Sequence, residues 1–136
     1  MVDKNFLNEF PPLVREFAAY KLTIQGCSEK TVNEYLLDLR TFCRYLVAES
    51  DGISTSGQDF EKISITHLDT EFFEKLTTSQ IYEFLYYTDK ERGNESRAKA
   101  RKLSAITFFL DKINCFHKLK NPFFVIKAQR ARGISL

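Results

Sequence analysis

Apolar residues recur at helical spacing along most of this 136-residue chain. Positions three or four apart lie on one side of an α-helix, because each residue turns the helix by about 100°. The spacing predicts long helices at about 11–25, 28–49, 79–91 and 95–120, with a short helical turn after Asp69. We therefore expect an all-α fold, a bundle of four to five helices.

Residues that start and stop helices set the limits of these segments. Proline in a first turn costs no hydrogen bond, so Pro11 and Pro12 open the first helix, and Gly26 ends it. Ser28 caps the second helix, and Pro122 forbids continuation of the last. The third helix is capped by Thr-Thr-Ser at 77–79.

Each predicted helix has one apolar side that we expect to face the core. The 11–25 helix has Leu13, Phe17, Tyr20 and Ile24 on this side, and the 28–49 helix has Val32, Leu36, Leu39, Cys43 and Leu46. The 79–91 helix has Ile81, Phe84, Leu85 and Tyr87, and the 95–120 helix has Leu103, Ile106, Leu110 and Ile113.

Three stretches lack this periodicity. Residues 1–9 are polar and are expected to fray, and residues 50–66, rich in Gly and Ser, are expected to form a long loop. At 121–136 a short apolar run precedes a basic tail. We interpret 1–120 as one domain and 121–136 as an extension and the start of a linker. An excised domain or a natural flexible tail explains this ending.

The composition is typical of a soluble globular domain, with 43% apolar and 28% charged residues. No apolar run is long enough to span a membrane, and the N-terminus does not resemble a signal peptide, so we expect a cytoplasmic protein without a membrane partner. The cysteines and the isolated histidines lack the spacing of a metal site or of a disulfide framework, so no metal or other cofactor is expected: they are Cys27, Cys43, Cys115, His67 and His117.

Basic residues are concentrated toward the C-terminus. Residues 96–136 contain ten Lys or Arg against one acid, Asp111, for a net charge of +9. Residues 1–95 contain ten basic and seventeen acidic residues, for a net charge of −7. Such segregation favours a partner rich in phosphate, although an acidic protein or a membrane surface also attracts it.

Two predicted helices carry basic residues on the side away from the core. In the 95–120 helix this side holds Arg97, Arg101, Ser104, Phe108 and Lys112. In the 28–49 helix it holds Lys30, Asn33, Leu37, Arg40 and Arg44. A solvated surface explains one such face, but two of them favour binding to nucleic acid.

Several motifs resemble the N-terminal core-binding (SAM-like) domain of tyrosine recombinases of the Xer and phage-integrase type. They are Ser28-x-x-Thr31-x-x-x-Tyr35-x-x-Asp38-Leu39-x-x-Phe42-x-x-Tyr45-Leu46, a helix at 76–87, Arg101-Lys102-Leu103-Ser104-Ala105-Ile106-x-x-Phe109, and Asn121-Pro122. Thr107 departs from the family, which often has a basic residue there, so one phosphate contact is expected to be missing. The 50–66 loop is also long for the family.

The resemblance implies a SAM-like four-helix domain, packed as an orthogonal bundle, that forms half of a C-shaped clamp on duplex DNA. Its 28–49 and 95–120 helices would face a recombination half-site. In the family, strand cleavage belongs to a separate C-terminal domain with a tyrosine nucleophile, so this segment is expected to bind DNA and not to cut it. The resemblance also implies a tetramer on DNA for the whole recombinase, whereas we expect the isolated domain to be monomeric.

Cationic and polar side chains on the two helices are the predicted DNA ligands. Phosphates are expected to contact Lys30, Arg40, Arg44, Arg97, Lys99, Arg101 and Lys102, and also Thr31 near a helix start. Base edges are within reach of Asn33, Ser104 or an arginine. The alternative function is a SAM-like protein-interaction module with Phe108 and Leu37 as exposed anchors.

Overall fold

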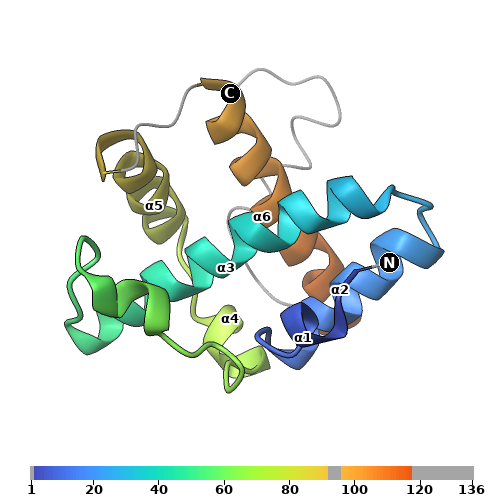
Figure 1. Cartoon of the computed structure of the whole chain (residues 1–136), viewed down its shortest axis with the longest axis horizontal. Helices are drawn as coiled ribbons and strands as arrows, with labels where there is room; N and C mark the ends of the chain where they lie inside the picture. Colours follow the sequence, from blue (N-terminus) through green and yellow to red (C-terminus); the bar gives the residue numbers. More distant parts are fainter. Residues whose placement is uncertain (1, 92–95, 118–136) are drawn as a thin grey trace.

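The computed structural model describes residues 2–91 and 96–117, with side chains for 2–90 and 97–113 (Figure 1). Its elements are α1 (Lys4–Leu7), α2 (Pro12–Thr23), α3 (Glu29–Asp51), η1 (Gln58–Lys62), α4 (Thr70–Glu74), α5 (Thr78–Glu91) and α6 (Ser96–His117). Every regular element in these ranges is helical, which confirms the all-α expectation. Helix α3 crosses the middle of the molecule and contacts α2, α5, α6 and η1.

Polar caps fix the helix starts as the sequence predicts. The Ser28 hydroxyl accepts a hydrogen bond from the Thr31 amide at the start of α3. Thr77 and Gln80 satisfy each other's backbone amides at the start of α5, which is a capping box. The other end of α3 is closed by Gly52, whose φ of 71° is strained for residues with a side chain.

Aromatic rings connect the helices in the core. Seven phenylalanines are completely buried in the described part of the chain: Phe10, Phe17, Phe42, Phe60, Phe73, Phe84 and Phe109. The Phe109 ring of α6 packs edge-on against Phe17 of α2 and Phe73 of α4. Such edge-to-face pairs add to the apolar area that the rings bury. Helix α6 therefore closes a core to which α2 and α4 both contribute.

The predicted core sides of α3 and α5 are largely confirmed, but that of α2 is wrong by about one residue. Val14, Phe17 and Ala18 are buried, whereas Ile24 is 74% exposed. Lys21 completes the buried side, although a lysine was not expected there. On α6, likewise, Leu103 is only half-buried, and Lys102 lies inside.

Residues 2–9 are structured, contrary to the expectation that the first nine residues fray. Asp3 caps α1 by accepting a hydrogen bond from the Asn5 amide. Val2 is buried, and the Phe6 ring packs edge-on against Phe10 at 5.1 Å. Only Phe6 of these three lies in α1, so the short helix and the residues on either side of it together bury apolar groups that are separated by polar neighbours.

The 50–66 stretch is also more ordered than the predicted loop. It contains η1, whose Phe60 is buried, and Ile63 and Ile65 after it are buried as well. The Tyr87 hydroxyl of α5 donates a hydrogen bond to the Thr55 carbonyl. The stretch is therefore part of the core beside α3 and α5. In the described ranges, none of the helices has the length and apolar character needed to cross a bilayer.

Candidate nucleic-acid interface

The contact between α3 and α6 holds a buried carboxylate between two cations. Asp38 of α3 is 4% exposed. It accepts hydrogen bonds from Nε and Nη2 of Arg101 at 2.9 and 3.2 Å, and Lys102 Nζ lies 3.3 Å from its Oδ1. A buried charge is tolerated only when it is paired and hydrogen-bonded, and Asp38 meets both conditions. One carboxylate and two cations leave this contact with a net positive charge.

The two cations differ in their access to solvent. The Arg101 side chain is 42% exposed, whereas that of Lys102 is buried. The hydrogen bond to Asp38 raises the pKa of Arg101, although partial burial opposes the rise. Arg101 is therefore a fixed, permanently charged group at the surface. Lys102 stabilises Asp38 from inside the bundle and is not placed for the predicted phosphate contact.

Other predicted ligands lie beside Arg101 on α6. Arg97, one turn before it, is exposed, and Ser104, one turn after it, is half-buried. Lys99 instead points to α5, where its ammonium lies 2.6 Å from a carboxylate oxygen of Asp89. The open edge of α6 therefore presents Arg97 and Arg101, with Ser104 at its border.

The exposed side of α3 carries further predicted ligands. Leu37 and Thr41 follow Lys30 by seven and eleven residues. Both separations are close to whole numbers of helical turns, so the three side chains project at similar angles. Lys30 and Leu37 are exposed. Asn33 is half-buried, and so is Thr31, whose hydroxyl accepts a hydrogen bond from Ser28. We refer to Arg97, Arg101, Ser104, Lys30, Thr31, Asn33 and Leu37 as the α3–α6 surface.

Arg40 and Arg44 form a second cationic cluster. Arg40 Nη1 lies 2.9 Å from a Glu9 carboxylate oxygen. Arg44, whose side chain is 12% exposed, donates to the Ile63 carbonyl and to Glu61. These contacts fix α1 and the segment after η1 against α3. The sequence does not show that Arg44 is used within the fold, because its acceptors lie in segments expected to be irregular.

The two clusters lie on different flanks of α3. Asp38 and Arg40 are two residues apart, so their side chains leave the helix about 200° from each other. Arg101 is bound to Asp38 and therefore meets α3 on the side away from Arg40. By the same angles Asn33 and Leu37 each lie within about 20° of Arg44, so the exposed side of α3 and the Arg40–Arg44 cluster belong to one stripe of the helix, and Asp38 lies apart from it.

Phe108 is not an exposed anchor. Its ring packs edge-on against Tyr35 of α3 at 6.0 Å, and the buried ammonium of Lys21 lies 4.2 Å above its centre. One turn on, Lys112 Nζ lies 3.8 Å from the centre of the Tyr20 ring. Cation–π contacts of this kind stabilise a desolvated ammonium. The apolar spacing along α2 did not predict that the Lys21 ammonium would lie beside the Phe108 ring.

The tyrosines whose pKa values are shifted do not resemble activated nucleophiles. Burial raises the pKa of Tyr45 to about 12 and also raises the pKa of Tyr35. A nucleophilic phenol needs instead a lowered pKa or an adjacent base. Burial likewise raises the pKa of the Cys43 thiol to about 12, which makes Cys43 an inert core residue.

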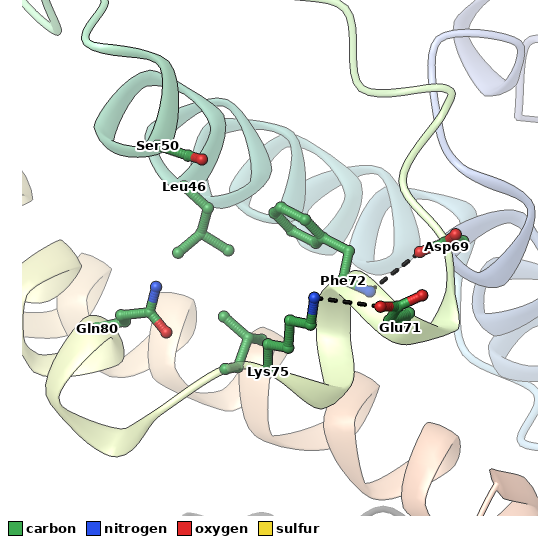
Figure 2. A pocket seen from close by; sticks show the side chains of 8 residues that line it. Leu46, Ser50, Asp69, Glu71, Phe72, Lys75 and Gln80 are labelled. Carbon is green, nitrogen blue, oxygen red and sulfur yellow. Dashed lines mark hydrogen bonds and ion pairs between the residues drawn. The ribbon is translucent and has the colours of Figure 1, made fainter.

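A pocket of about 390 Å³ opens between α3, α4 and the start of α5 (Figure 2). Its polar rim is engaged locally, because Asp69 accepts a hydrogen bond from the Phe72 amide and Lys75 pairs with Glu71. The remaining lining includes the apolar side chains of Leu46 and Leu76. The pocket therefore offers no convergent set of charges for catalysis or for phosphate binding.

Part of the predicted basic surface lies outside the described residues. The extension at 121–136, the basic residues after position 117 and the side chains of Cys115 and His117 all fall there.

The chain is similar to tyrosine recombinase XerC of Caldanaerobacter subterraneus subsp. tengcongensis, with 29% identity over 116 residues. The aligned region covers 84% of this chain and 33% of the recombinase, so the chain spans about a third of the length of that relative. No protein-family model matches the chain, and no solved structure matches it significantly. The likeness supports a relationship to tyrosine recombinases, which the motif resemblance also implies.

Proposed function

We propose, from this relationship to tyrosine recombinases, that the chain is a core-binding, DNA-holding arm of such a recombinase. In this proposal residues 1–120 bind one recombination half-site in duplex DNA, and strand cleavage belongs to a catalytic domain that lies after the linker at 121–136. The whole recombinase would act in the cytoplasm as a tetramer on DNA, and the isolated arm would be a monomer.

The observation that carries the proposal is the open cationic edge of α6 beside the exposed side of α3, in a chain similar to a recombinase. Arg97 and Arg101 are two exposed cations one turn apart on this edge. A rod-like duplex can lie along the α3–α6 surface, where these cations and Lys30 neutralise phosphates. Thr31, Asn33 and Ser104 lie at the border of the surface, where hydroxyl and amide groups can bind phosphates or base edges.

The cations that are already paired have other roles in the proposal. Arg40 and Lys99 each contact a single carboxylate, from Glu9 and Asp89 respectively, so phosphate can compete for them at the edges of the surface. Arg44 and Lys102 stabilise the fold through their contacts within the protein and do not contact DNA in this proposal. Binding is therefore expected to have a salt dependence set by few phosphate contacts and not by the total basic charge.

A double substitution tests the proposal. Arg97→Ala with Arg101→Ala removes two contacts from the α3–α6 surface, and Lys62→Ala with Lys75→Ala removes the same charge from η1 and its neighbour α4. Fluorescence anisotropy with a labelled 20-bp duplex should show weaker binding and a smaller salt slope for the first pair only. Circular dichroism and thermal melting check that both proteins fold. Equal binding by the two variants contradicts the proposal.

The alternative is a protein-interaction module, for which Leu37 is the favourable observation because 46% of it is exposed on α3. It predicts a partner that stays bound after nuclease treatment and whose affinity does not change with salt. Leu37→Ser should release that partner while leaving duplex binding intact. The two functions are thus separated by one substitution and one nuclease digestion.

A further inference from the structure

We infer that Arg101 reads a guanine in the major groove and that Asp38 is the positioning residue that aims it. The inference rests on the proposed function, since it names the base that the α3–α6 surface would recognise. Its basis is the way in which the Arg101 guanidinium is bound, and not the presence of positive charge.

The hydrogen bonds to Asp38 use one edge of the guanidinium. Arg101 donates from Nε and Nη2, the side-on edge, to the two carboxylate oxygens at 2.9 and 3.2 Å. A planar guanidinium has five N–H donors in a rigid fork, so the end-on edge formed by Nη1 and Nη2 keeps two parallel N–H groups. No hydrogen bond occupies that edge among the described residues. With 42% of the side chain exposed, the edge is accessible from outside.

Asp38 cannot turn with Arg101, so the guanidinium plane is fixed. The carboxylate is 4% exposed, and Lys102 Nζ holds it from the other side at 3.3 Å. Two hydrogen bonds between two planar groups define both the position and the rotation of the fork. A freely rotating surface arginine would not have this orientation before binding, and it would lose side-chain entropy when it bound a base.

The fixed fork matches a base edge better than it matches a phosphate. Guanine presents O6 and N7 side by side in the major groove, and bidentate arginine is their most common specific partner. An arginine fork can also bind a phosphate, but the Asp38 carboxylate, whose Oδ2 lies 2.9 Å from Arg101 Nε, weakens the attraction of this guanidinium for an anion. Asp38 thus lowers the attraction of Arg101 for an anion while it fixes the geometry of the guanidinium. This combination suits recognition of a neutral base.

The test uses the complete chain and a pool of 20-bp duplexes with a randomised centre, from which bound molecules are sequenced. The wild-type protein should enrich guanine at one position. Arg101→Lys keeps the charge without the fork, so it should bind the unselected pool within about threefold of wild type and lose about tenfold in preference at that position. Asp38→Asn should weaken the same preference without weakening binding to the pool.

Glu34→Gln is the matched control, because it removes one acid of α3 near Arg101 without a hydrogen bond to its guanidinium. It should leave the guanine preference unchanged. If Asp38→Asn does not fold, Arg101→Lys decides alone, since Asp38 then keeps Lys102. A loss of affinity for all sequences alike would make Arg101 a phosphate contact and overturn the inference while leaving the proposed function intact. Absence of duplex binding by the wild-type chain would overturn both.

Discussion

The ammonium of Lys21 lies 4.2 Å from the centre of the Phe108 ring and donates a hydrogen bond to Gln25 Oε1 at 2.7 Å. This relationship joins α2 to α6 through a charged group inside the bundle. The rings of Phe17 and Tyr35 are also within 6 Å of the ammonium, at 5.7 and 5.9 Å. A buried lysine thus completes the apolar side of α2.

The Lys21–Phe108 contact should appear as coupling in a double-mutant cycle. We expect Lys21→Met and Phe108→Leu each to change the free energy of unfolding, with a coupling energy of about 1 kcal/mol because the ammonium and the ring stabilise each other. Urea unfolding followed by circular dichroism measures all four proteins. The pair Lys30→Met and Phe108→Leu, which joins an exposed lysine to the same ring change, should be additive. Additive behaviour of Lys21 and Phe108 contradicts the cation–π interpretation.

Arg44 should contribute to stability far more than its acidic partner does. Arg44→Ala leaves the Ile63 carbonyl without this donor and removes the link to the segment after η1, so we expect a loss of about 2 kcal/mol. Glu61→Gln changes an ion pair whose acidic member is 62% exposed, and such pairs contribute at most about 1 kcal/mol. Urea unfolding of both variants makes the comparison. Equal losses for the two would show that the ion pair, and not the carbonyl contact, matters.

Releasing Arg40 from Glu9 should strengthen binding to duplex DNA. Glu9→Gln removes a carboxylate oxygen 2.9 Å from Arg40 Nη1, and the freed guanidinium then gains a phosphate, which steepens the salt slope by about 1. Glu71→Gln makes the same change of net charge and releases Lys75 on α4. Anisotropy titrations at several salt concentrations should separate the two variants. An equal gain for both would reflect net charge alone.

The sequence predicts the helices well, because caps and apolar spacing are local properties of the chain. Ser28 and Thr77 illustrate this, since each accepts a hydrogen bond from a neighbouring backbone amide. The candidate site is predicted less well. Asp38 and Arg101 are 63 residues apart, and nothing local shows that one positions the other.

Buried cations are the main source of error in the predicted site. Periodicity treats every lysine and arginine as solvent-facing, so it places Lys21 and Lys102 at the surface. Both are buried, the first over aromatic rings and the second against Asp38. A charge enters the core only when distant groups compensate it, and those groups become visible only in the folded arrangement.

The buried thiol of Cys43 predicts a loss of stability in alkaline solution. Burial raises its pKa from 9.0 to about 12, so between these values the folded protein keeps a proton that the unfolded chain releases. The folded state then binds more protons, and its stability falls as the pH rises through this interval. Each pH unit costs up to about 1.4 kcal/mol.

Thermal melting between pH 8 and pH 11 measures this effect. Cys43→Ala should melt at a lower temperature at pH 7, because it leaves a cavity, but should lose less of its stability between pH 9 and pH 10. Tyr45→Phe should retain the early loss and flatten the curve only above about pH 10, where an ordinary tyrosine ionises. Parallel curves for wild type and Cys43→Ala would exclude the thiol as the cause.

Because Phe109, Arg101 and Lys102 all belong to α6, the earlier helices cannot complete their packing during translation until α6 has left the ribosome. A nascent chain ending at residue 95 would expose the rings of Phe17 and Phe73 and carry Asp38 without its cations. The acidic segment before α6 and α6 itself are thus obligatory halves of one folding unit. Expressed as two separate polypeptides split near residue 93, they should regain structure only on mixing.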